Sequence, residues 1–168
     1  MRPGLLGWLT RTPVLIGLFI ATLLIGTSFY FVIQAIEGDL LDMIWTGDDA
    51  ITRLNELSDA QKEAHLLGTV TLDVLYPLAY CALFVGLLCR LAWRWRWGLI
   101  LLPVMAALCD FAENTVQAIA LSGRPSEILF VKDLVTPIKF YGLLATLALI
   151  TLLALVALVR HLRRPKPH

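Results

Sequence analysis

The chain has 168 residues, of which 58% are hydrophobic and 16% are charged, and its formal net charge is +1. Soluble globular domains are about 45–50% apolar and about 25% charged, so this composition excludes an ordinary water-soluble enzyme, a disordered chain and a disulfide scaffold. The small net charge provides no bulk attraction to nucleic acid, and no nucleic-acid partner is expected. The sequence therefore predicts a single membrane domain that covers residues 1–168.

Four stretches are apolar over the roughly 20 residues that a helix needs to cross the hydrocarbon core of a bilayer. The predicted spans are about 13–33, 66–88, 97–121 and 134–159. These runs are continuously apolar, whereas the strands of a membrane barrel alternate apolar and polar side chains. The predicted fold class is therefore all-α: a polytopic membrane protein that forms a four-transmembrane-helix bundle.

Basic residues are concentrated on one side of the predicted spans. Nine Lys and Arg residues flank the spans on the side of the two termini, and four lie on the opposite side. The positive-inside rule then predicts a multi-pass protein of the inner (plasma) membrane, in contact with lipids, with both termini and a basic tail at 160–168 in the cytoplasm. Trp93, Trp95 and Trp97 alternate with arginines and are interpreted as an interfacial anchor.

The segment 37–65 connects the first two spans and is expected to be a short extracytoplasmic helical loop. Ser58 followed by Gln61 is typical of a capping box, which predicts a helix that begins there and runs into the second span. Apolar residues in the rest of the loop indicate short helical pieces on the outer membrane surface. His65 is interpreted as a side chain at the membrane interface.

Polar and ionisable side chains recur at helical spacing inside three of the spans. A charge inside a span costs at least about 2.5–3.5 kcal/mol on insertion scales, so each one needs a partner or a purpose. At a rise of about 1.5 Å per residue, Asp73, Glu113 and Lys139 lie roughly 8–12 Å below the outer boundary. Side chains from three helices are therefore expected to meet at one level. The candidates for ligand binding or proton exchange are Asp73, Tyr76, Tyr80, Asp110, Glu113, Asn114, Gln117 and Lys139.

The charges in this set do not balance. Three carboxyl groups, those of Asp73, Asp110 and Glu113, accompany one buried ammonium group, that of Lys139. At least one carboxyl is therefore expected to be protonated or matched by a bound cation. Lys139 is predicted to pair with Asp73 or Glu113. Pro77 is predicted to free the carbonyl group of Asp73 for a hydrogen bond.

The remaining residues indicate little other chemistry. The cytoplasmic half of the bundle is almost wholly apolar, which favours a pocket that opens outward over a channel through the membrane. Cys81, Cys89 and Cys109 lack C-x-x-C spacing, and no histidine lies within a predicted span. No metal site and no cofactor are therefore expected.

Three short stretches resemble a family of small four-helix integral membrane proteins of uncharacterised function. They are T-L-D-V-L-Y-P-L-A-Y at 71–80, L-P-V-M-A-A-L-C-D-F-A-E-N at 102–114 and T-P-I-K-F at 136–140. The pattern of that family is D-x-x-Y/F-P-x-x-Y, then L-P-x-x-A-x-x-D-x-x-E-N, then a lysine near the start of the last helix. The resemblance covers about residues 66–145, implies a four-helix membrane protein and supplies no activity. It selects Asp73, Tyr76, Pro77, Tyr80, Pro103, Asp110, Glu113, Asn114 and Lys139.

Three functions remain open at this point. The first is binding or transport of a small or amphiphilic ligand, with or without coupling to protons. The second is an intramembrane enzyme that uses two carboxyl groups, or a carboxyl group and Lys139, as acid and base on a lipid-like substrate. The third is an accessory subunit of a larger membrane complex, which is disfavoured because three facing polar stripes satisfy one another within one bundle. Buried polar residues can also simply hold helices together, so a purely structural role is the alternative to any site.

Overall fold

A computed structural model describes residues 4–163, with the exception of the side chain of Trp93. Within these residues the chain is all-α, as the sequence predicts. The end of the predicted basic tail, residues 164–168, lies outside the described residues, as do residues 1–3. The elements in chain order are α1 (Leu5–Leu9), α2 (Thr12–Ile36), η1 (Leu41–Met43), α3 (Gly47–Glu56), α4 (Asp59–Leu91), η2 (Trp93–Trp95), α5 (Arg96–Leu99), α6 (Leu101–Leu121), η3 (Ser126–Val131) and α7 (Lys132–Leu162).

Four segments are long and apolar enough to cross a membrane, which agrees with the four predicted spans. They are Thr12–Ile36, Asp59–Leu91, Arg96–Leu121 and Ser126–Leu162. The second segment begins seven residues before its predicted start at 66, because its helix begins at the capping box. There the backbone N–H of Ser58 donates to Gln61 Oε1 at 2.9 Å, and the Ser58 hydroxyl oxygen accepts from the Gln61 N–H. These two bonds satisfy backbone groups that the first turn of a helix leaves free.

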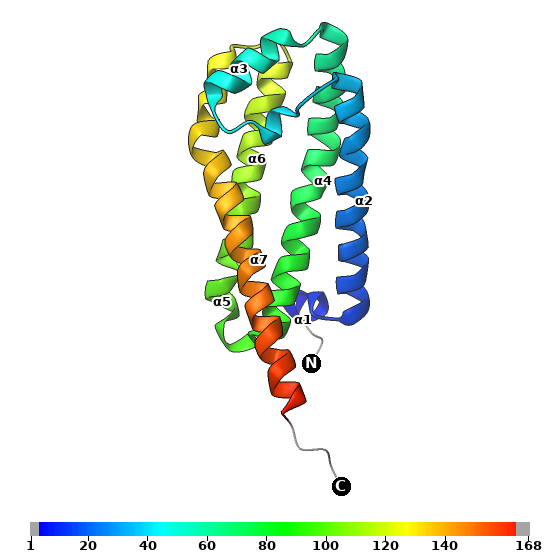
Figure 1. Ribbon diagram of the computed structural model, residues 1–168, viewed down its shortest axis with the longest axis vertical. Coiled ribbons are helices and arrows are strands. Elements are labelled where there is room, and N and C mark those ends of the chain that lie inside the picture. Colours follow the sequence, from blue (N-terminus) through cyan, green and yellow to red (C-terminus); the bar gives the residue numbers. More distant parts are fainter. Residues whose placement is uncertain (1–3, 164–168) are drawn as a thin grey trace.

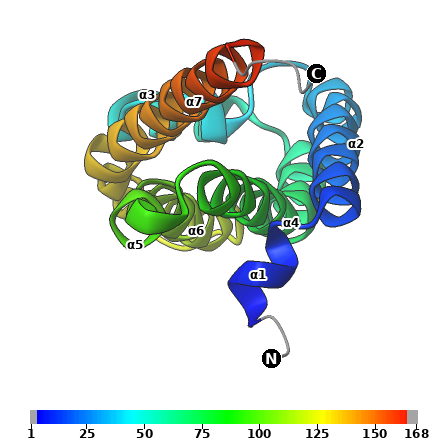
Figure 2. The same cartoon turned by 90° about the horizontal axis from the view of Figure 1, so that it is seen from below.

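The four long helices stand side by side in chain order (Figure 1). Helix α2 packs on α4, α4 packs on α6, and α6 packs on α7, while α4 also contacts α7. Helices α2 and α7 do not pack on each other to a comparable extent. Viewed along the bundle, they stand at the two ends of the curved row that the four long helices form (Figure 2). Large apolar side chains of both helices are exposed along their length, which forms a surface suited to lipid.

Segment 37–65 folds over one end of the bundle, here named the α3 end, and the opposite end is named the α1 end (Figure 1). The short helical pieces predicted for this segment are η1 and α3. Beneath them lies a cluster of buried apolar side chains from the loop, α2, α6 and η3: Ile36, Leu40, Leu41, Ala50, Leu54, Leu57, Val116, Ala120, Leu121 and Leu129.

Polar contacts attach this cap to the long helices. The side chains of Arg53 and Gln61 both donate to the carbonyl oxygen of Ile36, each at 3.1 Å, where α2 ends. The backbone N–H of Gly47 donates to Asp133 Oδ1 at 2.6 Å, which joins the start of α3 to the first turn of α7. A Cβ at Gly47 would lie 2.7 Å from Phe130 Cα, so this close approach needs glycine. The cap is therefore held at a defined position above α6 and α7.

Candidate functional site

Charged side chains from three elements meet around the ammonium group of Lys139, near the α3 end. Lys139 Nζ lies 2.5 Å from Glu113 Oε2, 2.7 Å from Asp42 Oδ1 and 3.5 Å from Asp110 Oδ1. Helix α7 supplies the lysine, α6 supplies Asp110 and Glu113, and η1 supplies Asp42. One of the two predicted partners of Lys139, Glu113, is thus confirmed.

Glu113 is shared between two lysines. Its Oε1 atom pairs with Lys132 Nζ and accepts a hydrogen bond from Thr136 Oγ1 at 2.8 Å, while its Oε2 atom faces Lys139. Lys132, Thr136 and Lys139 are spaced i, i+4 and i+7, so they lie on one face of α7. The glutamate, both lysines and the threonine are all buried. We name the five charged residues Asp42, Asp110, Glu113, Lys132 and Lys139 the charged cluster.

The burial of Lys132 corrects the sequence interpretation, which counted Lys139 as the single buried ammonium group. The side chain of Lys132 is 0% exposed. The predicted span began at 134, so Lys132 was counted among the basic residues outside the membrane, although its spacing places it on one helix face with Thr136 and Lys139. In the structure α7 begins at Lys132, η3 packs against α7, and the N–H of Gly47 at the start of α3 donates to Asp133 in that first turn. The burial of Lys132 is therefore a consequence of how the loops pack.

Asp42 is the functional candidate that the sequence interpretation missed. It lies in η1, outside the predicted spans, among eight acidic residues of the loop 37–65. The sequence does distinguish Asp42 from the other acids of the loop. Asp42 has two apolar residues on each side, in the run L-L-D-M-I. Leu40 and Leu41 are buried and place Asp42 beneath the surface, whereas Met43 is exposed. Periodicity along a helix could not find it, since η1 is a single short turn.

His65 holds η1 in place, which corrects its interpretation as an interfacial side chain. It is 1% exposed, and its Nε2 atom accepts a hydrogen bond from the backbone N–H of Leu41 at 2.9 Å. Because Nε2 accepts, the ring proton is on Nδ1, which donates to Thr69 Oγ1 at 3.2 Å. Through this chain of hydrogen bonds, α4 positions the turn that brings Asp42 to Lys139.

The predicted residues of α4 and α6 are brought together, with one exception. Tyr80 donates its hydroxyl hydrogen to Asp110 Oδ2 at 2.9 Å. Asn114 Nδ2 donates to the carbonyl oxygen of Asp73 at 2.6 Å, which is the carbonyl that Pro77 was predicted to free. Gln117 is the exception: it is buried, but neither of its side-chain polar atoms has a hydrogen-bond partner among the described residues.

Asp73 differs from the other carboxylates because its side chain has no ion pair or hydrogen bond among the described residues. The residue is 5% exposed and lines a cavity next to the charged cluster. The predicted alternative pair between Asp73 and Lys139 is therefore not formed. Tyr76 lies one turn further along α4 on the same cavity wall, and its ring makes edge contacts with Tyr80 at 5.5 Å and Phe29 at 5.8 Å between centroids.

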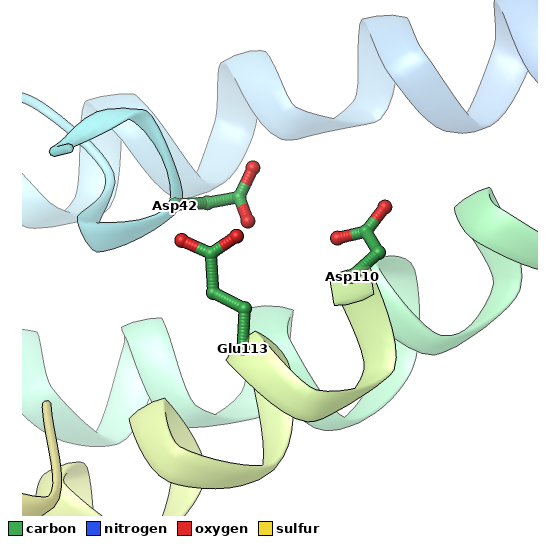
Figure 3. Close-up of side chains that lie close together, drawn as sticks. All are labelled: Asp42, Asp110 and Glu113. Atoms are coloured by element: carbon green, nitrogen blue, oxygen red, sulfur yellow. The ribbon is translucent and has the colours of Figure 1, made fainter. Parts of the chain in front are cut away.

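Three carboxylates of the cluster are close enough to one another to suggest a metal site. Oxygen atoms of Asp42, Asp110 and Glu113 all lie within 4.8 Å of one another, and Figure 3 shows these side chains converging from η1 and α6. The ammonium group of Lys139 contacts all three, however, and so takes the position that a cation would need. The geometry is that of an internal ion-pair network, in which lysine is the cation.

The cavity beside the cluster has a volume of about 860 Å³ and lies between α2 and α7. Its polar end is formed by Asp42, Asp73, Asp110 and Lys139. Its apolar walls come from α2, η1, α4 and α7: Gly26, Thr27, Phe29, Tyr30, Phe31, Ile33, Leu40, Met43, Tyr76, Phe140 and Leu143.

The position of this cavity differs from the outward-opening pocket expected from the sequence. The turn η1 lines the cavity at the α3 end, where an outward opening would lie. The lining residues Tyr30 and Phe31 of α2 are 60% and 73% exposed, on the side where α2 and α7 do not pack together. The cavity therefore opens sideways between these helices. The spacing of polar residues along a single helix does not indicate the direction in which a cavity opens. That direction depends on which helices pack against one another.

The fold and the site define a class of protein: an all-α chain with four membrane-length helices around a buried charged cluster and a lateral cavity. Comparisons with protein-family models, curated proteins and solved structures found no match. The resemblance of the three short motifs to a family of small four-helix membrane proteins therefore stays a prediction.

Proposed function

We propose that this protein is a multi-pass protein of the inner (plasma) membrane that binds or transports a small amphiphilic ligand. The observation that carries the proposal is the cavity between α2 and α7, which combines a charged end with long apolar walls. Its volume of about 860 Å³ falls in the range of about 300–1,000 Å³ that is typical of small-molecule sites. A ligand with a polar head and an apolar body would place its head at the charged end of the cavity and its body along the apolar walls.

The opening of the cavity supports a ligand that comes from the bilayer. In the proposed orientation, α2 and α7 present their exposed apolar side chains to lipid, and the cavity opens between them. The head of the ligand would lie beside Asp73, and its apolar part would lie along Phe29, Phe140 and Leu143. No barrier of packed side chains from α2 and α7 would separate that apolar part from the hydrocarbon, so the energetic cost of entering the site would be small.

An intramembrane acid/base enzyme is the second candidate, and one specific observation favours it. Asp73 lines the cavity, and its carboxylate has no hydrogen-bond donor among the described residues, so its oxygen atoms are available to take a proton from a bound substrate. The accessory-subunit hypothesis receives less support, because the polar stripes of α4, α6 and α7 contact one another instead of facing outward. Their mutual contacts leave no described polar stripe for a partner helix.

The binding function predicts that filling the cavity removes the ligand. Leu143 lines the cavity, whereas its neighbour Leu144 is 64% exposed on the outer side of α7. Leu143→Trp should reduce the fraction of protein that carries a bound molecule about tenfold, a loss of about 1.4 kcal/mol in binding. Native mass spectrometry of protein purified in mild detergent measures that fraction.

Leu144→Trp is the matched control, because it makes the same substitution one residue away on the lipid-facing surface. It should leave the bound fraction equal to that of the wild-type protein. Equal retention in the Leu143→Trp and Leu144→Trp proteins, or a wild-type protein that carries no molecule, would contradict the proposed function.

The proposed orientation places both termini in the cytoplasm and the α3 end outside it. The warrant is the excess of basic residues on the side of the termini, where Arg90 in the last turn of α4, Arg94 in η2 and Arg96 in α5 lie at the α1 end. Alkaline phosphatase fused after Gly47 should be active, and the same enzyme fused after His168 should be inactive. Activity at the tail fusion together with inactivity at Gly47 would reverse the orientation.

A further inference from the structure

We propose that the ligand of the lateral cavity is a cationic amphiphile, a molecule with an ammonium head and a single apolar chain, and that Asp73 is the counter-ion of its head. This inference rests on the proposed function, since it names the chemical class of the molecule that the cavity takes. It is carried by the charge balance of the site, by the unpaired carboxylate of Asp73 and by the aromatic side chains beside that carboxylate.

The charge balance at the polar end of the cavity is negative. Glu113 and Lys132 pair with each other away from the cavity lining. The charged groups that do line it are the carboxylates of Asp42, Asp73 and Asp110 and the ammonium group of Lys139. Three carboxylates with one ammonium group leave a local excess of negative charge, which a low-dielectric site does not hold without protons or a further cation.

Lys139 is not free to bind an anionic head. Its ammonium group is already in contact with the carboxylates of Asp42, Asp110 and Glu113. It donates hydrogen bonds to Asp42 Oδ1 and Asp110 Oδ1, and its charge is also paired with Glu113 Oε2. An anionic head would therefore compete with three carboxylates for Lys139 and would be repelled by Asp73, whereas a cationic head would meet an available acceptor.

Asp73 supplies that acceptor. The residue is 95% buried, since its exposed fraction is 5%, and its carboxylate lines the cavity without a hydrogen-bond or ion-pair partner among the described residues. A buried carboxylate without a donor is costly, and a ligand ammonium group would provide the missing donor. Asp42 and Asp110 are less available, because both already contact Lys139.

Aromatic residues line the same cavity as Asp73. Tyr76 and Phe29 both line the cavity, and their rings meet edge to face with centroids 5.8 Å apart. Phe140 lines it from α7 as part of the apolar wall, since its ring stacks on Trp45 at 5.2 Å between centroids and already has Lys139 Nζ 5.1 Å from its centroid. The face of an aromatic ring attracts ammonium groups, and the rings also form an apolar surface for the chain of the ligand. The site therefore combines a counter-ion with aromatic walls.

The test uses three probes that share a twelve-carbon chain and differ in the head: dodecylamine in its protonated form, dodecanoate and dodecanol. Each is titrated by calorimetry into the full-length protein in dodecyl maltoside micelles. Dodecylammonium should bind at least tenfold more tightly than the other two probes. Asp73→Asn should weaken its binding at least tenfold, and Asp73→Glu, which keeps the charge, should weaken it less.

Asp39→Asn is the matched control, because Asp39 is an exposed acid near the same end of the bundle and does not line the cavity. It should bind dodecylammonium as the wild-type protein does. Asp73→Asn should fold normally, since the carboxylate that it removes has no partner. If it does not fold, Asp73→Ser provides the same loss of charge with a smaller side chain.

The outcomes separate this inference from the proposed function. Binding of dodecylammonium that is unaffected by Asp73→Asn, or binding of dodecanoate that is equally tight, overturns the cationic ligand. If all three probes bind equally and Leu143→Trp abolishes their binding, the cavity is a ligand site and only the inference about charge fails. If none binds, the inference fails, and native mass spectrometry of the co-purified molecule decides the proposed function separately.

Discussion

Glu113→Gln is expected to destabilise the protein by about 3–5 kcal/mol, the cost of breaking a buried ion pair by removing one partner. Glu113 is completely buried and is shared by Lys132, Lys139 and Thr136. A neutral glutamine keeps the shape of the side chain but leaves the ammonium group of Lys132 without its carboxylate. Reversible unfolding in mixed micelles, followed against the mole fraction of denaturing detergent, measures the free energy of unfolding.

Two further variants make this prediction specific. Glu127→Gln makes the same substitution at an exposed residue of η3 and should change the free energy of unfolding by no more than about 0.5 kcal/mol. The double variant Glu113→Gln with Lys132→Met removes the stranded charge and should recover part of the loss. A Glu113→Gln protein as stable as the Glu127→Gln control would show that the buried network does not stabilise the bundle.

Lys139→Met is expected to lower the free energy of unfolding by a similar amount, about 3–5 kcal/mol. Here the group that is removed is the cation and not a carboxylate. The substitution removes the cation that contacts Asp42, Asp110 and Glu113, so three neighbouring carboxylates lose the charge that offsets their repulsion. Thermal unfolding in detergent measures the loss. Lys62→Met, a partly buried lysine near the start of α4 and outside the charged cluster, is the matched control.

This variant also tests whether the charged cluster holds the cap. The contact between Lys139 and Asp42 joins α7 to η1, so its removal should increase the rate of amide hydrogen exchange in residues 38–46. Asp42→Asn added to Lys139→Met should restore part of the thermal stability without restoring slow exchange. Unchanged exchange in the Lys139→Met protein would mean that His65 and the apolar contacts of the cap hold η1 without the ion pair.

The loss on Lys139→Met already follows from the sequence, which predicts a buried pair with Lys139, whereas the loss on Glu113→Gln depends on the tertiary structure. With Lys139 as the one buried lysine of the site, a neutral replacement of Asp110 and Glu113 together would relieve their repulsion and would leave stability unchanged or raise it. The structure places Lys132 beside Glu113, so replacing Glu113 now strands a cation. A second lysine and a fourth carboxylate, that of Asp42, change which substitutions are costly.

Several features of this protein are determined by the sequence itself, because each depends on residues close together along the chain. A run of about 20 apolar residues specifies a membrane-length helix wherever it occurs, so the four long helices were predictable. The capping box at Ser58 and Gln61 and the carbonyl group freed by Pro77 are also local. Helical spacing placed Asp110, Glu113 and Asn114 on one buried face of α6 for the same reason.

The partners of these residues were decided only by the tertiary structure. Whether Lys139 meets Asp73 or Glu113 depends on the rotation of α7 against α4 and α6, and ångström differences in packing choose between them. The recruitment of Asp42 depends on a hydrogen bond from the backbone of Leu41 to His65, and the direction of the cavity depends on α2 and α7 packing on each other less than the other neighbouring helices do. Such contacts join residues far apart in the chain, and no local pattern of residue types specifies them.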